Sequence, residues 1–113
     1  MFRGDIYLLK LNKSLGSVQA GIRPVLIVQN NKGNINSPST IVCSITSANK
    51  KPLPTHVFIS KSGGLKKNST VLTEQVFTVD KKQLTKHLGT ITDKLTLIRL
   101  NECLKISLGL KGE

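Results

Sequence analysis

One arginine in this sequence stands where a polar loop meets an apolar strand. Arg23 follows the glycine-containing stretch 16–21 and precedes Pro24 and the aliphatic run 25–28, which should be covered on both faces of a sheet. Pro24 disfavours helix at Arg23 and fixes the entry into the strand. The guanidinium is always charged and offers a planar fork of donors that suits a phosphate. Taken alone, the segment fits a surface arginine at a strand edge about as well as a functional one.

A threonine at the end of the next predicted strand is the second candidate. In the run 40–46, side chains alternate between two faces, and Ile41, Cys43 and Ile45 form the apolar one. Thr46 therefore points its hydroxyl away from the core, close to the end of the strand. By itself, a threonine in this place is equally typical of a good β-former or of a cap for the following turn.

The charge of the chain limits its partners. With 17 Lys plus Arg against 6 Asp plus Glu, the 113 residues carry a net charge of +11, which indicates a polyanionic partner. No apolar run approaches the roughly 20 residues of a membrane span, and no signal peptide is recognisable, so we expect a cytoplasmic protein. Cys43 and Cys103 lack metal-ligand spacing and are expected to be reduced core residues.

The candidate residues need a scaffold of short strands. Turn-rich segments separate the expected strands, and a single domain covering residues 1–113 fits the length. Strands are predicted at 5–11, 24–30, 40–46, 56–60, 70–72 and 75–79, with long polar connections at 30–38 and 60–68. From Thr92, a possible helix cap, the leucines 97, 100, 104 and 108 recur at helical spacing and predict a C-terminal helix with a core or dimer-contact stripe. The fold class is mainly β with a C-terminal α-helix, in a small β-barrel.

Short strings of residues, in one order along the chain, resemble the MazF/PemK family of toxin endoribonucleases. The strings are Arg3-Gly4-Asp5-Ile6-Tyr7, Gly16-Ser17-x-Gln19-x-Gly21-x-Arg23-Pro24, Ser44-Ile45-Thr46, Leu53-Pro54-Thr55-His56-Val57 and Glu74-Gln75-Val76. The resemblance runs from about Arg3 to Leu108. It implies an SH3-like barrel, a homodimer, and cleavage of single-stranded RNA without a metal ion or another cofactor. It also implies inhibition by a cognate antitoxin, for which we expect an acidic, partly disordered segment.

The resemblance also implies roles for individual residues. Arg23 and Thr46 would be catalytic. Independently of the resemblance, Ser17, Gln19 and Gln75 offer neutral donors and acceptors that suit substrate binding at base edges or phosphate, and each could equally be a solvated polar residue. Cleavage would use the 2′-hydroxyl of the RNA, with Arg23 stabilising charge on the phosphate and Thr46 donating a hydrogen bond to it or orienting the attacking hydroxyl. One departure is Val18, where many members carry Glu. Either the loop residue tunes binding or this copy is slower.

Two other readings stay open. His56 and His87 could act as base and acid of a two-histidine nuclease, although His56 also fits a local hydrogen bond and His87 lies in a lysine-rich segment. A non-catalytic basic nucleic-acid-binding module of SH3-like fold would account for the charge alone. The few aromatic residues are not clustered, so RNA would be read through loop hydrogen bonds and phosphate contacts rather than through stacking. Lysines 50, 51, 61, 66 and 67 would steer RNA and antitoxin alike.

Overall fold

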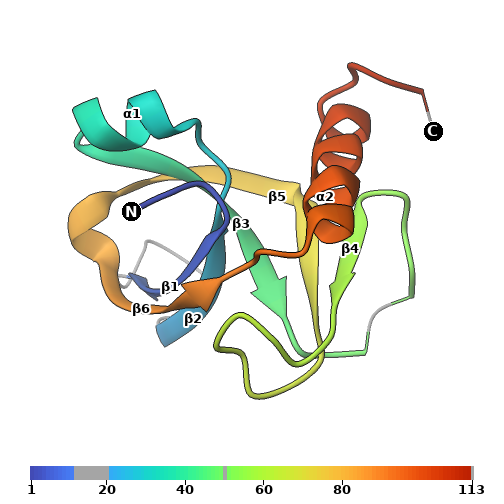
Figure 1. The fold of residues 1–113 in the computed structure, drawn as a ribbon, viewed down its shortest axis with the longest axis horizontal. Helices are drawn as coiled ribbons and strands as arrows, with labels where there is room; N and C mark the ends of the chain where they lie inside the picture. Colours follow the sequence, from blue (N-terminus) through green and yellow to red (C-terminus); the bar gives the residue numbers. More distant parts are fainter. Residues whose placement is uncertain (12–20, 50, 113) are drawn as a thin grey trace.

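The chain folds into one curved sheet with a long helix on one side (Figure 1). The computed structural model describes residues 1–11, 21–49 and 51–112. The strands are β1 (Asp5–Leu11), β2 (Gly21–Ile27), β3 (Ser39–Thr46), β4 (His56–Ile59), β5 (Ser69–Asp80) and β6 (Leu84–Thr90). The helices are α1 (Asn31–Asn36), a 3-10 turn η1 (Lys81–Gln83) and α2 (Lys94–Ser107).

The sheet is antiparallel and open. Its six strands run in the order β4-β5-β3-β2-β1-β6, so β4 and β6 are its edges. Among the described residues no backbone pairing joins these two edges, and a closed SH3-like barrel is therefore not confirmed. The mainly β architecture with a C-terminal helix is confirmed. No helix in the described part of the chain is long and apolar enough to cross a membrane.

Both faces of the central strands are buried, as the aliphatic run 25–28 predicts. Leu26 and Cys43 belong to a cluster on the side of α2, whereas Val25, Ile27 and Val42 belong to a second cluster on the other face. In β3, Cys43 is fully buried and Ile45 is 5% exposed on the predicted core face. The expectation of a single core face is wrong, however, because Val42 on the other face is fully buried as well. The consequence is that β2 and β3, which carry the two candidate residues, are packed on both faces of the sheet.

The C-terminal helix packs its leucines into the protein rather than outward. Leu100 is buried, and Leu97 and Leu104 pack against the same cluster, over β4 and β5. Leu108 lies beyond the last turn and is exposed. The predicted cap at Thr92 is wrong by one residue: the side chain of Asp93 accepts the Thr96 backbone N–H at 3.2 Å. A carboxylate is the stronger acceptor, and it also suits the helix N-terminus electrostatically.

Four elements differ from the sequence prediction. The strand predicted at 24–30 begins earlier, at Gly21, and the strands predicted at 70–72 and 75–79 are parts of one strand, β5. Strand β6 was not predicted, because it overlaps the lysine-rich segment 81–87, which is typical of a loop, and its position at the sheet edge makes a polar strand acceptable. Helix α1 replaces part of the polar connection at 30–38, and Asn30 caps it by accepting from the Gly33 N–H.

Strand β5 is continuous but interrupted in its pairing. Cys43 of β3 pairs with Val76, whereas the adjacent Ser44 pairs with Leu72. Residues 73–75 therefore lie between two registers, and we call this segment the β5 bulge. Such an insertion bends a strand and re-aims its side chains.

Candidate active site

Arg23 and Thr46 face each other where two central strands separate. Strands β2 and β3 pair up to Val25 and Ser44, and continuing that register by two residues on each strand brings Arg23 opposite Thr46. Pairing stops there at Pro24, which has no N–H to donate. Beyond this point Arg23 stays paired with Leu9 of β1, and Thr46 stays paired with Thr70 of β5. The two side chains thus lie on β2 and β3 where these strands separate, while β1 and β5 still pair with the outer side of each strand. We call this opening between β2 and β3 the fork.

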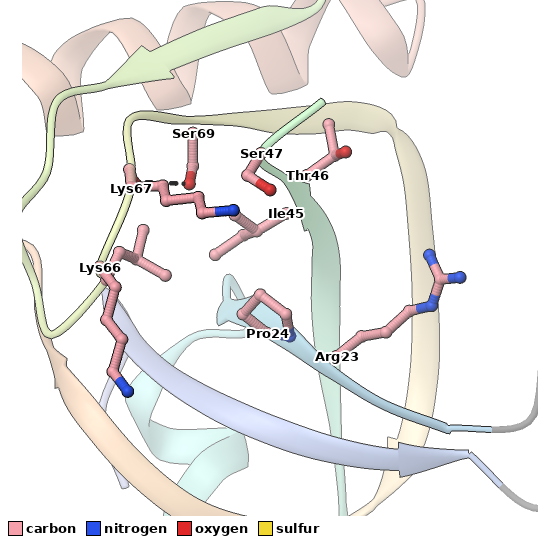
Figure 2. A pocket seen from close by; sticks show the side chains of 9 residues that line it. Arg23, Pro24, Ile45, Thr46, Ser47, Lys66, Lys67 and Ser69 are labelled. Atoms are coloured by element: carbon pink, nitrogen blue, oxygen red, sulfur yellow. Dashed lines mark hydrogen bonds between the residues drawn. The ribbon is translucent and has the colours of Figure 1, made fainter. Parts of the chain in front are cut away.

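The fork opens into two adjoining cavities, and Arg23 and Thr46 line both of them. The larger has a volume of about 350 Å³ and the smaller about 130 Å³. The larger is drawn in Figure 2, where Lys66 and Lys67 lie across from the ends of the two strands. The smaller adds Gln75 to apolar side chains that include Leu11 and Phe77. Three of the predicted site residues, Arg23, Thr46 and Gln75, are therefore brought together.

Among the described residues, the Thr46 hydroxyl accepts a hydrogen bond but donates none. Its Oγ1 accepts a hydrogen bond from the Ala48 backbone N–H at 3.2 Å, so the turn after β3 holds the oxygen in place. A hydroxyl that accepts one bond still has its own proton for another acceptor. Thr46 is partly exposed, and a phosphate oxygen in the cavity can supply that acceptor.

The field in the larger cavity is positive. Arg23, Lys66 and Lys67 line it, and none of its described lining residues carries a carboxylate. The ion pairs among the described residues join Glu74 to His56, Asp5 to His87 and Glu102 to Lys111. Within this part of the chain Arg23 takes part in no ion pair, and the cations that line the cavity favour binding of an anion there.

Sequence reasoning missed the serines of the larger cavity. Ser47 directly follows Thr46 and lines the same wall, and its position next to a candidate residue is the one signal that could have indicated it. Ser69 is buried, and its Oγ donates to the Lys67 carbonyl at 2.9 Å, which holds the chain that carries the two lysines. Of the lysines predicted to steer ligands, Lys66 and Lys67 reach this cavity, whereas Lys50 lies outside the described residues.

Two predicted site residues belong to the segment before β2. Ser17 and Gln19, and Val18 between them, lie outside the described residues. Their roles in substrate binding stay predictions. Arg23 itself is described and exposed at the near end of β2.

The two histidines are far apart in the sheet order and line neither cavity. His56 is on edge strand β4, where its Nε2 lies 3.0 Å from Glu74 Oε2, and its side chain is 8% exposed. His87 is on the opposite edge strand, β6, with Nε2 3.5 Å from Asp5 Oδ1 and its ring 5.0 Å from that of Tyr7. The structure does not bring them together, so it gives no geometry for a two-histidine nuclease.

Neither cysteine is placed as a nucleophile. Both thiols are free and buried. Burial raises the pKa of Cys43 to about 12, because Arg3 lowers it by less than burial and Glu74 raise it. Within residues 1–11, 21–49 and 51–112, no group of three or more His, Cys, Asp or Glu side chains could hold a metal ion.

Comparison with known proteins identifies the family. The chain is 48% identical over 112 residues to Endoribonuclease MazF of Staphylococcus saprophyticus, covering 97% of this chain and 92% of that protein. It is 44% identical over 110 residues to Endoribonuclease EndoA of Bacillus subtilis, covering 96% and 94%. Its fold is similar to that of an endoribonuclease solved in complex with its cognate antitoxin from a mycobacterial species, with a TM-score of 0.81, 28% identity, and coverage of 100% and 99%. The family model of PemK-like, MazF-like toxins of type II toxin-antitoxin systems matches residues 2–108, and the chain belongs to this family.

Proposed function

We propose that this MazF-family endoribonuclease cleaves single-stranded RNA, chiefly mRNA in the cytoplasm, in the fork between β2 and β3, and that it does so without a metal ion. The result is loss of translation and arrest of growth. The observation that carries the proposal is the meeting of Arg23 and Thr46 in a cavity that also presents Lys66 and Lys67. The endoribonuclease names of relatives at 44% and 48% identity support it.

The chemistry proposed is an internal attack by the RNA. The 2′-oxygen of one nucleotide forms a bond to the adjacent phosphorus, and the bond from phosphorus to the 5′-oxygen breaks. The 2′-hydroxyl loses its proton and the departing 5′-oxygen gains one, which leaves a 2′,3′-cyclic phosphate and a 5′-hydroxyl. Charge builds on the non-bridging oxygens in the transition state, where fixed donors contribute most.

Arg23 and Thr46 divide this task. The guanidinium offers two parallel N–H donors to the non-bridging oxygens, and its charge attracts the added negative charge. The Thr46 hydroxyl, held by the Ala48 N–H, donates to the same phosphate or orients the 2′-hydroxyl. Arginine is a poor proton donor because its guanidinium holds its proton tightly, so we assign Arg23 to charge stabilisation.

A homodimer is part of the proposal. Most leucines of the α2 stripe pack against the core of their own subunit. Leu95 and Ile98 of the same helix, however, are 71% and 56% exposed. Phe58 of β4, the strand against which α2 packs, is 55% exposed. Covering these apolar side chains with a second copy would bury them and would double the basic surface offered to one RNA.

The antitoxin is proposed to compete with RNA. One relative of similar fold is solved with its cognate antitoxin. A cavity lined by Arg23, Lys66 and Lys67 attracts carboxylates as well as phosphates. An acidic, partly disordered segment of the antitoxin would therefore occupy the same groove.

The test is cleavage in the presence of a chelator. Purified protein is incubated with a mixed-sequence RNA in EDTA, and the cut sites and end groups are mapped. The proposal predicts cuts at a short recurring sequence with cyclic phosphate and 5′-hydroxyl ends, absent with Arg23→Ala. Binding without cleavage would instead support the basic binding module, and cleavage that EDTA abolishes would overturn metal independence.

A further inference from the structure

The β5 bulge is held from the side opposite the cavities. Thr73, its first residue, is fully buried. Its N–H donates to the Thr55 carbonyl at 3.1 Å, and its Oγ1 donates to the same carbonyl at 2.6 Å. The Ser107 hydroxyl of α2 donates to the Thr73 carbonyl at 2.6 Å. The bulge thus begins at a residue whose backbone and side chain are both fixed by the segment before β4 and by α2.

Glu74, the second residue of the bulge, is also bound to the segment around the start of β4. Its Oε1 accepts from the Thr55 hydroxyl at 2.8 Å, and its Oε2 lies 3.0 Å from His56 Nε2. Partial burial raises the pKa of Glu74, but hydrogen bonds from its own backbone, from Thr55 and from His56, together with the His56 charge, outweigh that effect and hold the pKa below its usual value. The carboxylate is therefore ionised at neutral pH and can hold both partners.

Gln75, the third residue, points the other way. Successive side chains of an extended chain alternate between its two sides, so fixing Glu74 toward Thr55 and His56 directs Gln75 to the opposite side. There it lines the smaller cavity together with Arg23 and Thr46. A glutamine amide offers two donors and one acceptor oxygen, which is the pattern needed to read the edge of a base.

We propose that Thr55, His56 and Glu74 are positioning residues for RNA recognition: they lock the β5 bulge so that the Gln75 amide is fixed beside the scissile phosphate and reads a neighbouring base. The proposal rests on the proposed function for its ligand, single-stranded RNA. It connects two strings, Thr55-His56 and Glu74-Gln75, that the sequence presents as separate. It also gives His56 a role that needs no proton transfer.

The negative charge of Glu74 lets the direction of one change in RNA affinity test the proposal. Removing a carboxylate from a protein that binds a polyanion should strengthen RNA binding on electrostatic grounds alone. Positioning predicts the opposite sign, because a released bulge no longer presents Gln75 in one orientation. Glu74→Ala should therefore weaken binding by about 10-fold, the loss of one ordered hydrogen bond at about 1.4 kcal/mol per decade.

The experiment is a double-mutant cycle between Glu74 and Gln75. The variants are Glu74→Ala, Gln75→Ala and the pair, with Glu102→Ala as the matched loss of an exposed carboxylate and Glu74→Gln as the conservative variant. Affinity is measured by anisotropy with a labelled mixed-sequence RNA carrying 2′-fluoro groups, which cannot be cut. Base preference next to the cut is measured by sequencing the ends of a cleaved natural RNA pool.

The expected result is that Glu74→Ala weakens binding and relaxes base preference as Gln75→Ala does, that the two losses do not add, and that Glu74→Gln retains most of both. His56→Gln, which keeps a donor, should behave like Glu74→Gln. Circular dichroism melting of each variant distinguishes a loss of RNA binding from a loss of folding. If Glu74→Ala does not fold, Thr55→Ala, which removes the other hydrogen bond to the Glu74 carboxylate, takes its place in the cycle. Additive losses, or tighter binding by Glu74→Ala, would overturn the inference. Absence of cleavage by the parent protein would overturn the proposed function alone, since the anisotropy cycle needs no cleavage.

Discussion

Replacement of Arg23 tests the proposed mechanism most directly. Arg23→Ala removes a side chain that is exposed and makes no ion pair within the described residues, so the free energy of unfolding should change by no more than about 0.5 kcal/mol. The effect on rate should be far larger. At about 4 Å and an effective dielectric constant of about 20, two unit charges attract by about 4 kcal/mol. Loss of one preorganised donor to a developing oxyanion costs about 2.7–4 kcal/mol, which is 10²–10³ in rate or more.

Arg23→Lys separates charge from geometry. The lysine keeps the positive charge and loses the planar fork, and a hydrogen bond to a charged group contributes about 1.5–3 kcal/mol. Its rate should therefore lie between those of the parent and Arg23→Ala, about 10-fold or more below the parent. Lys105→Ala, on the exposed face of α2, removes the same unit charge away from the cavities and should cleave normally.

The assay is single-turnover cleavage of one labelled RNA, with circular dichroism to verify folding. The loss for Arg23→Ala should appear in kcat more than in KM, because the added charge exists only in the transition state. A folded Arg23→Ala protein that keeps kcat within about threefold of the parent would remove Arg23 from the mechanism. An equal loss in Lys105→Ala would show that net charge alone is responsible.

Further predictions concern the hydroxyl, the dimer, the antitoxin and the thiols. Thr46→Val should lose activity while Thr46→Ser keeps most of it, and their melting temperatures should be close, because the bond from Ala48 is partly exposed to water; equal rates for both variants would make the hydroxyl structural. Light scattering at micromolar concentration should give a dimer for the parent and a monomer for Ile98→Glu, and a monomeric parent would contradict the proposed interface. Titrating antitoxin into the RNA complex should release RNA, and both associations should weaken with salt; simultaneous independent binding would rule out a shared groove. Cys43, with its pKa raised by burial to about 12, should not react with a thiol reagent at pH 8 until the protein is unfolded, so rapid labelling of the native protein would contradict its burial.

The sequence was informative where one residue's neighbours determine its environment. The aliphatic run 25–28 indicates burial directly, and this is confirmed. The alternation in β3 identifies Cys43 and Ile45 as buried but misses Val42, which the second cluster buries on the other face. The proximity of Arg23 and Thr46 could be predicted only through the family resemblance, because it depends on the register between two strands. The β5 bulge shows the limit most clearly. The sequence predicts a break at residues 73–74 between two strands, whereas hydrogen bonds with Thr55 and Ser107, both distant in sequence, hold one continuous strand.

The order of strands in the sheet has a consequence for how such a toxin can diversify. Arg23 and Thr46 stand at the ends of β2 and β3, the two strands farthest from either edge, whereas His56 belongs to edge strand β4. A mutation in an edge strand disturbs few packed neighbours, because one side of the strand faces solvent. A mutation in a central strand disturbs packing on both faces of the sheet. Under the proposed function, selection can therefore alter His56 and the contacts it makes while Arg23 and Thr46, the proposed cleaving pair, stay unchanged. A lineage of such proteins can then change which RNA sequences it cuts without altering the residues proposed to cut them.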